Sequence, residues 1–362
     1  MPRLRIHVVS WRDLDDPEAG GSELHINHLA SRWADAGHDV TIRTGSVAGL
    51  PDRVERDGYQ VVRRGGRVSG LVRSPLSEAM GRQGPRDALV EVWHGINFLA
   101  PLWCRGPRVA IAHHVHGEQF RFVLPGPAAR IAGFIERDVS PRLYRSTPLV
   151  TLSASTRDEL VGLGHPPGNI HVVSPGVDDR FSPGGRRTPH PTVLTVGRLM
   201  PQKRVDALID ALRPVRDLIA DLELVVVGAG PDGERLRASA PPWVTFAGRV
   251  DDEALVAAYR SAWVVASASI AEGWNMTLTE AGACATPAVA SRIAGHVDAV
   301  VDGETGMLAG DGPALSAAVA RILTDERLRR RLGQAARSHA ARYTWDAAAA
   351  AVLAALDDQP RR

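Results

Sequence analysis

The sequence predicts an α/β protein built from two doubly wound, Rossmann-like domains. Its 362 residues suggest about two domains, each large enough to bury a core. Short apolar runs of strand length alternate with segments whose apolar residues recur at helical spacing, and this alternation starts afresh in the second half. Repeated strand–helix alternation is typical of a parallel sheet with helices on both faces.

The first domain is expected to span residues 1–174. Ile26, Leu29, Ala30 and Trp33 fall at i, i+3, i+4 and i+7, which predicts an amphipathic helix that ends before Gly37. Each strand of this domain is a short apolar run suited to a buried parallel sheet. Strands are predicted at residues 4–10, 40–42, 89–93, 109–112 and 149–153.

Residues 175–191 are dense in proline and glycine, which indicates a linker. The second domain is expected at 192–344. The alanine-rich segment 345–362 is predicted to be a helix that returns toward the N-terminal domain. Two such domains are expected to face each other across a deep cleft, with ligands at the carboxyl ends of the strands. Strands are predicted at residues 192–196, 222–227, 244–246 and 263–266, with a helix from Val205 to Leu212.

Composition argues against several classes of function. The formal net charge of +2 and the lack of like-charge runs give no indication of a nucleic-acid-binding surface. No apolar run is long enough to span a membrane, and the N-terminus reads as a first strand rather than a signal peptide. Cys104 and Cys284 form no metal or redox motif, so we expect two reduced, buried thiols in a cytoplasmic protein.

Five arginines in the first domain raise the question of a contact with the inner face of a membrane. Acidic residues are interspersed among them, so a mixed, solvated surface is the preferred interpretation, and peripheral contact with an anionic membrane is the alternative. The arginines are Arg121, Arg130, Arg137, Arg142 and Arg145, and the acidic residues are Glu118, Glu136 and Asp138.

The only lysine of the chain, Lys203, stands in a segment that suits phosphate binding, whereas the other 42 basic side chains are arginine. Residues 197–203 connect a predicted strand to a predicted helix, where backbone amides and the helix dipole attract anions. Arg198 and Lys203 add two full positive charges. We therefore expect this loop to hold a diphosphate without a metal ion.

Two glutamates follow about seventy residues later. Glu272 lies on a loop after an apolar strand, and Glu280 lies about two turns into the next predicted helix. Carboxylates can accept paired hydrogen bonds from the vicinal hydroxyls of a sugar or a ribose, but spacing alone would equally suit two solvated surface residues. Gly273 allows a ligand to approach the backbone, and the amides of residues 275–277 open the helix.

Taken together, these segments resemble glycosyltransferase family 4. The shared pattern is Val196-Gly197-Arg198 with Lys203, then Glu272 and Glu280. Further matches, in the family's order and along almost the whole chain, are Gly20-Gly21, Leu152-Ser153, Ser174 to Asp178, Val227 to Pro231, Phe246 to Val250 and Asp302 to Leu308. The resemblance implies the GT-B fold and a retaining enzyme that transfers a hexose-type sugar from a UDP- or GDP-sugar to an acceptor.

The resemblance also implies roles for individual residues. Arg198 and Lys203 would bind the donor diphosphate, Glu272 the transferred sugar and Glu280 the ribose. Gly20-Gly21 would form a loop that lets donor phosphate and acceptor approach the first helix. Other donor contacts would come from Gly228, from Arg249 and Val250 beside the base, and from the segment Gly273, Trp274, Asn275, Met276 and Thr277.

A histidine near the reacting sugar is a further feature that the resemblance implies. Alignment from Pro107 favours His113, with His114 one residue away and His116 close by. Such a histidine could donate a hydrogen bond to the sugar. Metal binding by this run is not expected, because adjacent residues of a strand point to opposite faces.

This chain departs from the family pattern at two donor-side places. Asn275 stands where glycine is usual, and Gly295-His296-Val297-Asp298 lacks a Pro-Glu pair. These differences leave the donor sugar open. Asp13-Leu14-Asp15 has the DxD form that other glycosyltransferases use for metal, but it lies in a polar loop and is expected to be solvated.

No cofactor is expected, since the nucleotide sugar is a substrate. A pyridoxal phosphate phosphorylase would need a lysine for the Schiff base, and the one lysine already has a phosphate-binding role. A nucleotide-sugar epimerase and a non-catalytic nucleotide-sugar-binding protein remain as alternatives. The acceptor, whether a glycan, a glycolipid or a small metabolite, stays open.

Overall fold

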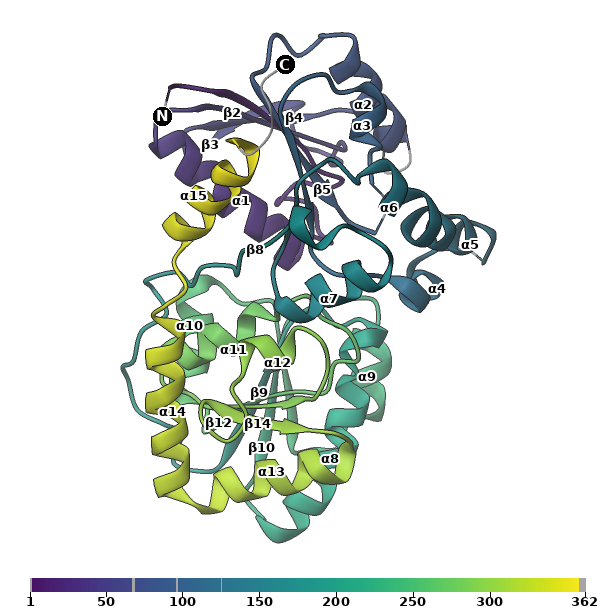
Figure 1. The fold of residues 1–362 in the computed structure, drawn as a ribbon. Coiled ribbons are helices and arrows are strands. Elements are labelled where there is room, and N and C mark those ends of the chain that lie inside the picture. The colour runs from purple at the N-terminus through teal and green to yellow at the C-terminus, as the bar shows by residue number, and fades with distance from the viewer. Residues whose placement is uncertain (1, 67–68, 96, 125, 358–362) are drawn as a thin grey trace. The chain divides into compact units, whose positions relative to one another are not determined.

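The computed structural model describes residues 2–66, 69–95, 97–124 and 126–357. The chain forms two compact units: unit 1 comprises Met1–Gly176 together with Trp345–Arg362, and unit 2 comprises Val177–Thr344. Each unit contains one sheet with helices packed on it (Figure 1). The predicted α/β class with two doubly wound domains is therefore confirmed.

The sheet of unit 1 has the order β3-β4-β2-β1-β5-β6-β7-β8. All neighbouring strands are parallel except β3 and β4, which form an antiparallel hairpin. The five strands predicted for this domain are all present, whereas β3, β4 and β8 were not predicted. The bounds are β1 Arg5–Val9, β2 Asp39–Thr44, β3 Arg53–Arg56, β4 Tyr59–Arg63, β5 Ala88–Trp93, β6 Arg108–Ala112, β7 Leu149–Thr151 and β8 Ile170–Val172.

Helix α1 of unit 1 packs as its apolar spacing predicts. Ile26, Leu29, Ala30 and Trp33 are all buried. The C-terminal helix α15 lies against α1, and the indole Nε1 of Trp33 donates to the carbonyl of Ala349 at 3.0 Å. The helices are α1 Gly21–Asp35, α2 Ser69–Ala79, α3 Ala100–Trp103, α4 Phe120–Val123, α5 Gly126–Phe134, α6 Ser140–Leu143, α7 Ala154–Gly162 and α15 Trp345–Asp357.

The sheet of unit 2 has the order β11-β10-β9-β12-β13-β14, which is the 3-2-1-4-5-6 order of a dinucleotide-binding domain. Its strands are parallel, and α8, α9 and α13 cover one face with a continuous apolar core. The strands are β9 Thr192–Val196, β10 Glu223–Val227, β11 Val244–Gly248, β12 Val264–Ser267, β13 Ala288–Ser291 and β14 Gly306–Ala309. The helices are α8 Val205–Leu218, α9 Gly233–Ser239, α10 Asp252–Ser261, α11 Met276–Ala283, α12 His296–Ala299, α13 Gly312–Thr324 and α14 Glu326–Ala340.

The segment expected as a linker packs along unit 2 over residues 177–191. Arg187 donates to the Thr286 hydroxyl at 2.7 Å and to the Ala285 carbonyl at 2.7 Å. Cys104 and Cys284 are buried and unpaired, as predicted. Within the part of the chain that the structure describes, no helix is both long and apolar enough to cross a membrane.

Two of the five arginines singled out in the first domain pair with acidic residues interspersed among them, as the preferred interpretation expects. Arg121 pairs with Glu118 at 2.8 Å, and Arg137 pairs with Asp138 at 2.9 Å. Peripheral contact with a membrane and a cytoplasmic location stay predictions.

Candidate active site

Each sheet has one point where the strand order reverses, and ligands of open α/β sheets bind at the carboxyl ends of the strands there. In unit 2 this point lies between β9 and β12, which are neighbours. In unit 1 it lies between β1 and β5. The loops that leave these four strands contain about half of the predicted site residues, and the others lie in α1 and α11 or directly after β6, β10 and β11.

The loop after β9 brings Lys203 to the loop after β12. Lys203 Nζ donates to Glu272 Oε1 at 2.6 Å, and the two side chains are 24% and 12% exposed. Burial acts to raise the pKa of Glu272, but the charge of Lys203 and hydrogen bonds from Lys203 and Ser269 act against it, so the net pKa is lowered and the carboxylate stays charged. A pocket at this edge of the sheet is lined by residues that include Gly197, Arg198 and Lys203.

Two glycines after β10 allow the loop of residues 197–203 to take this path. A Cβ atom at Gly228 would lie 1.9 Å from the carbonyl oxygen of Gly197, and one at Gly230 would lie 2.4 Å from that of Leu199. The loops are also joined by a hydrogen bond from the Leu199 amide to the Ala229 carbonyl at 3.0 Å. Gly228, predicted as a donor contact, therefore has a clear part in packing the loop. Arg249 and Val250 follow directly after β11, whose Gly248 carbonyl accepts from the Gly228 amide at 2.7 Å.

The loop from Gly273 to Asn275 leads into α11. Asn275 has a left-handed backbone with φ of +72°, a conformation in which asparagine is the usual substitute for glycine. Trp274 is buried, as is its neighbour Gly273, and it packs edge-on against Tyr343 with ring centroids 5.1 Å apart. Thr277 donates from its hydroxyl to Asn275 Oδ1 at 2.7 Å. The half-buried Met276 begins α11, so the N-terminal amides of the helix face the same loop.

Glu280, two turns into α11, is buried rather than solvated. The Tyr259 hydroxyl from α10 donates to Glu280 Oε2 at 2.7 Å. Burial raises the pKa of Glu280 to about 7, although the bond from Tyr259 acts in the opposite direction. Tyr259 was missed at the sequence level, because nothing in the spacing of α10 sets this residue apart from other core aromatics.

The glycine loop of unit 1 is held by Glu23 at the start of α1. The Gly20 amide donates to Glu23 Oε2 at 2.8 Å, and Gly21 is the first residue of the helix. The other oxygen of Glu23 lies 3.5 Å from His94 Nδ1 and 3.9 Å from Arg12 Nε. Burial acts to raise the pKa of Glu23, but His94 and Arg12 outweigh it, so the net pKa is lowered. Of Glu23, His94 and Arg12, only Glu23 could have been found from the sequence. An acidic residue three positions after a helix N-cap is typical of a capping box.

The structure separates the three candidate histidines. His113 follows β6, is buried, and its Nε2 lies 3.3 Å from Nδ1 of His25 on α1. Burial lowers the pKa of His113 well below its usual value, and His25 and His94 lower it further, so the ring is neutral. His114 is half-buried and stacks on His116 with ring centroids 4.1 Å apart. His113 is therefore the one that lies among the residues at the β1–β5 switch point.

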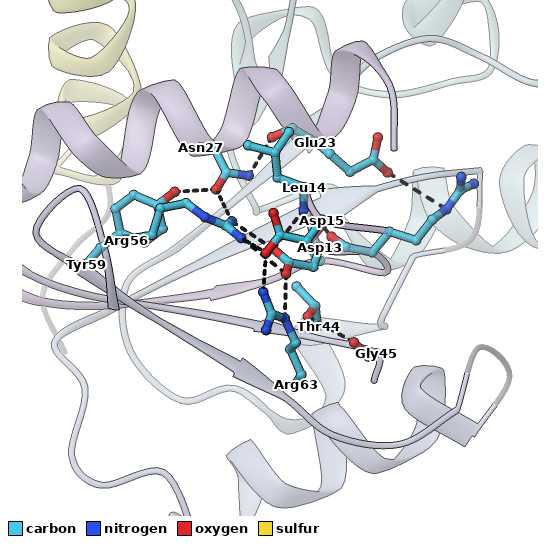
Figure 2. A network of polar contacts seen from close by, with 12 residues as sticks. Asp13, Leu14, Asp15, Glu23, Asn27, Thr44, Gly45, Arg56, Tyr59 and Arg63 are labelled. Carbon is cyan, nitrogen blue, oxygen red and sulfur yellow. Dashed lines mark hydrogen bonds and ion pairs between the residues drawn. The ribbon is translucent and has the colours of Figure 1, made fainter. Parts of the chain in front are cut away.

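The prediction that Asp13 and Asp15 are solvated is wrong for Asp13. Its carboxylate is 1% exposed and accepts from Arg63 Nε at 2.6 Å and from Arg56 Nη1 at 2.8 Å. Asp15 is 46% exposed and pairs with the same two arginines. Figure 2 shows both guanidinium groups pointing at the two carboxylates. The arginines come from β3 and β4, forty or more residues away, so no local pattern around Asp13 indicates the network.

Fold and site together define a class. A 3-2-1-4-5-6 sheet whose switch point carries a lysine, an arginine and a charged glutamate is suited to a nucleotide diphosphate joined to a polyhydroxy group. The two loops are therefore suited to a nucleotide-sugar-dependent enzyme.

Comparison with known proteins gives the family. Residues 178–339 match the model of glycosyl transferases group 1, and residues 19–181 match that of glycosyltransferase family 4. A D-inositol 3-phosphate glycosyltransferase of Catenulispora acidiphila is 32% identical over 96% of this chain and 92% of its own. A GDP-mannose-dependent phosphatidylinositol monomannoside mannosyltransferase of Mycobacterium tuberculosis is 29% identical over 92% and 94%. The chain belongs to glycosyltransferase family 4 and is a glycosyltransferase.

Solved structures agree on the fold. Sucrose-phosphate synthase of Thermosynechococcus elongatus superimposes with a TM-score of 0.81 at 21% identity, covering 97% of this chain and 98% of its own. Anabaena HepE, in complex with UDP and glucose, gives 0.74 at 16% identity over 99% and 100%. The GT-B fold expected from the sequence is confirmed.

Proposed function

We propose that the protein is a retaining, metal-independent hexosyltransferase whose donor is a UDP- or GDP-sugar. The Lys203–Glu272 pair at the β9–β12 switch point carries this proposal. In this pair a cation that can bind the diphosphate lies directly beside a carboxylate that can bind the sugar. The diphosphate and the sugar are likewise adjacent groups in a nucleotide sugar.

Each site residue then has a role. Arg198 and Lys203 bind the diphosphate, Glu272 binds hydroxyls of the transferred sugar, and Glu280 binds the ribose. His113 donates a hydrogen bond to the sugar, and Gly20-Gly21 admits phosphate and acceptor. Arg249 and Val250 border the base, while Gly273, Trp274, Asn275, Met276 and Thr277 line the sugar and phosphate through their backbone.

The chemistry needed is stabilisation of the leaving group. Negative charge builds on the diphosphate as the anomeric bond breaks, and fixed cations and helix N-terminal amides aimed at that charge lower the barrier. Arg198, Lys203 and the amides at the start of α11 supply these donors. The acceptor hydroxyl attacks from the face that the diphosphate leaves, so the anomeric configuration is retained.

The acceptor is to be sought first among inositol compounds. The names of the two relatives above give inositol 3-phosphate and a phosphatidylinositol mannoside as their acceptors, and both contain an inositol ring. A glycan or another small polyol belongs in the same panel, as does a glycolipid in detergent.

The test is calorimetric titration with UDP-glucose and GDP-mannose in EDTA, followed by nucleotide release with inositol 3-phosphate present. We expect micromolar to millimolar binding of one donor, unaffected by EDTA, and release that depends on an acceptor. Donor conversion without acceptor would favour an epimerase, and binding without any turnover would favour a non-catalytic binder. Strict dependence on added metal would contradict the proposal.

Donor affinity is expected to fall as the pH drops below about 7. Only the ionised form of Glu280 can accept from both ribose hydroxyls, and its raised pKa of about 7 means that acid protonates it early. The phosphates of a nucleotide sugar do not titrate in this range. Tyr259→Phe removes a bond that lowers this pKa, so the midpoint should move upward. Titration of wild type and Tyr259→Phe between pH 5.5 and 8.5 measures the shift, and identical profiles would contradict it.

A further inference from the structure

His296 is a buried histidine in the donor half of the molecule to which the proposed function gives no role. It begins α12 and is 0% exposed. Its Nδ1 lies 2.8 Å from the Ser291 carbonyl oxygen, which can only accept, so Nδ1 carries the proton. Burial lowers the pKa of His296 although Glu272 acts to raise it, so the ring is neutral. Its other nitrogen, Nε2, is therefore a hydrogen-bond acceptor.

That acceptor faces the side chain of Asn275. Asn275 Nδ2 lies 3.0 Å from His296 Nε2, and at the other end of the amide Oδ1 accepts from the Thr277 hydroxyl at 2.7 Å. Both ends of the amide are thus assigned by their partners, which fixes its orientation. The same Nδ2 also donates to Glu272 Oε1 at 3.4 Å.

The two loops are also in direct backbone contact. A Cβ atom at Gly295 would lie 2.6 Å from the Glu272 carbonyl oxygen and 2.9 Å from the Trp274 nitrogen, so only glycine permits this approach. Asn275 has a left-handed backbone, with φ of +72°, which asparagine adopts more readily than other L-residues but still at a cost that contacts with its surroundings offset. The bond to His296 is one of the contacts that hold it.

We propose that His296 is a positioning residue for the donor sugar: through the amide of Asn275 it holds the 272–275 loop and orients the Glu272 carboxylate. The inference rests on the proposed function, because it assumes that Glu272 binds the sugar. It also accounts for the pairing of two departures from the family pattern, since Asn275 stands where glycine is usual and His296 lies in the segment without the Pro-Glu pair.

His296→Leu tests the proposal, because leucine fills a similar volume without any hydrogen bond. Loss of the Asn275 anchor is expected to weaken binding of the nucleotide sugar by roughly three- to tenfold. Binding of the free nucleotide diphosphate should fall clearly less, because Arg198, Lys203 and Glu280 remain in place and only the backbone contacts of the loop with phosphate are affected. Calorimetric titration with UDP-glucose or GDP-mannose, against UDP or GDP, measures this difference.

A second variant shows whether the effect passes through Asn275. Glycine needs no side-chain anchor to adopt a left-handed backbone, so His296→Leu should cost much less in an Asn275→Gly background. His165→Leu is the matched control, since His165 is also buried but lies in unit 1 after α7. It should leave donor binding unchanged, and thermal melting checks that all variants are folded.

The outcomes are separable. If the wild-type protein binds no nucleotide sugar, the proposed function fails. If it binds but His296→Leu weakens nucleotide and nucleotide sugar equally, the positioning role is overturned and His296 serves only the fold. A loss as large in the Asn275→Gly background as in the wild-type background would overturn it too.

Discussion

Lys203→Ala is expected to lower kcat for sugar transfer by about 10²–10³-fold, the usual cost of removing one donor from a site of developing negative charge. Lys203 is the only ammonium group among the side chains of this protein, and it is 24% exposed beside a charged glutamate. Its removal takes away a charge aimed at the leaving diphosphate. It also deprives Glu272 of the cation that helps to keep it ionised.

The matched control is Arg235→Ala in the same unit. Arg235 is 55% exposed, pairs with Asp232 and Asp206, and is not among the residues that line the pocket. Its loss should leave kcat and KM unchanged. Lys203→Arg keeps the charge but replaces a compact ammonium with a planar fork, so we expect it to restore only part of the activity. Transfer by Lys203→Ala at the wild-type rate would contradict the assigned role.

The single lysine also allows a direct test of whether the bound nucleotide sugar covers Lys203. An amine-reactive acylating reagent can modify only Lys203 and the N-terminal amine of this chain. A bound nucleotide sugar should slow labelling at Lys203 and leave the N-terminal amine unaffected, which peptide mass spectrometry can distinguish. Equal labelling with and without a saturating donor would place Lys203 outside the binding site.

The fold could be predicted from the sequence where local pattern determines structure. Ile26, Leu29 and Trp33 predicted α1 because a helix brings residues three and four apart onto one face, and the same spacing predicted α8. The strands β13 and β14 were missed, since Ala288–Ser291 contains a single β-branched residue and Gly306–Ala309 contains none. The β3–β4 hairpin had an unused signal, because Asp57-Gly58, both at positive φ, is a common two-residue hairpin turn.

The site was predictable in its residue types but not in its internal contacts. Lys203 and Glu272 could be singled out, but their pairing depends on β9 and β12 being neighbours, which is a property of the whole sheet. Tyr259 and His296 act on Glu280 and Asn275 from other elements. Partners of this kind lie 21 residues away along the chain and have no fixed spacing, so local periodicity cannot reveal them.

Asp13 shows the same limit most sharply, and its replacement is the largest stability effect that we expect. Asp13→Asn keeps the shape of the side chain but removes its charge, which leaves the 2% exposed Arg63 without its nearest buried counter-ion. Breaking a buried ion pair from one side costs about 3–5 kcal/mol. Asp15 still pairs with Arg63, so the loss in the free energy of unfolding of unit 1 should lie near the lower end of that range.

Asp15→Asn is the matched control, because Asp15 pairs with the same two arginines but is 46% exposed. Solvent screens an exposed pair, so this variant should lose less than about 1 kcal/mol. Urea unfolding gives both free energies, and hydrogen exchange at β1 and β4 assigns the transition to unit 1. Equal losses in the two variants would show that burial is not what makes Asp13 important.

The loss of stability at low pH should differ between Asp13→Asn and Asp15→Asn. Burial acts to raise the pKa of Asp13, but the bonds and charges of Arg56 and Arg63 outweigh it and the net pKa is lowered. A carboxyl whose pKa is lowered on folding stabilises the protein above its unfolded pKa of about 3.9, and that contribution disappears as the pH falls through the folded value. Unit 1 of the wild type and of Asp15→Asn should therefore lose stability below about pH 4. Asp13→Asn should lack that part of the acid loss, because the charge on which it depends is already gone.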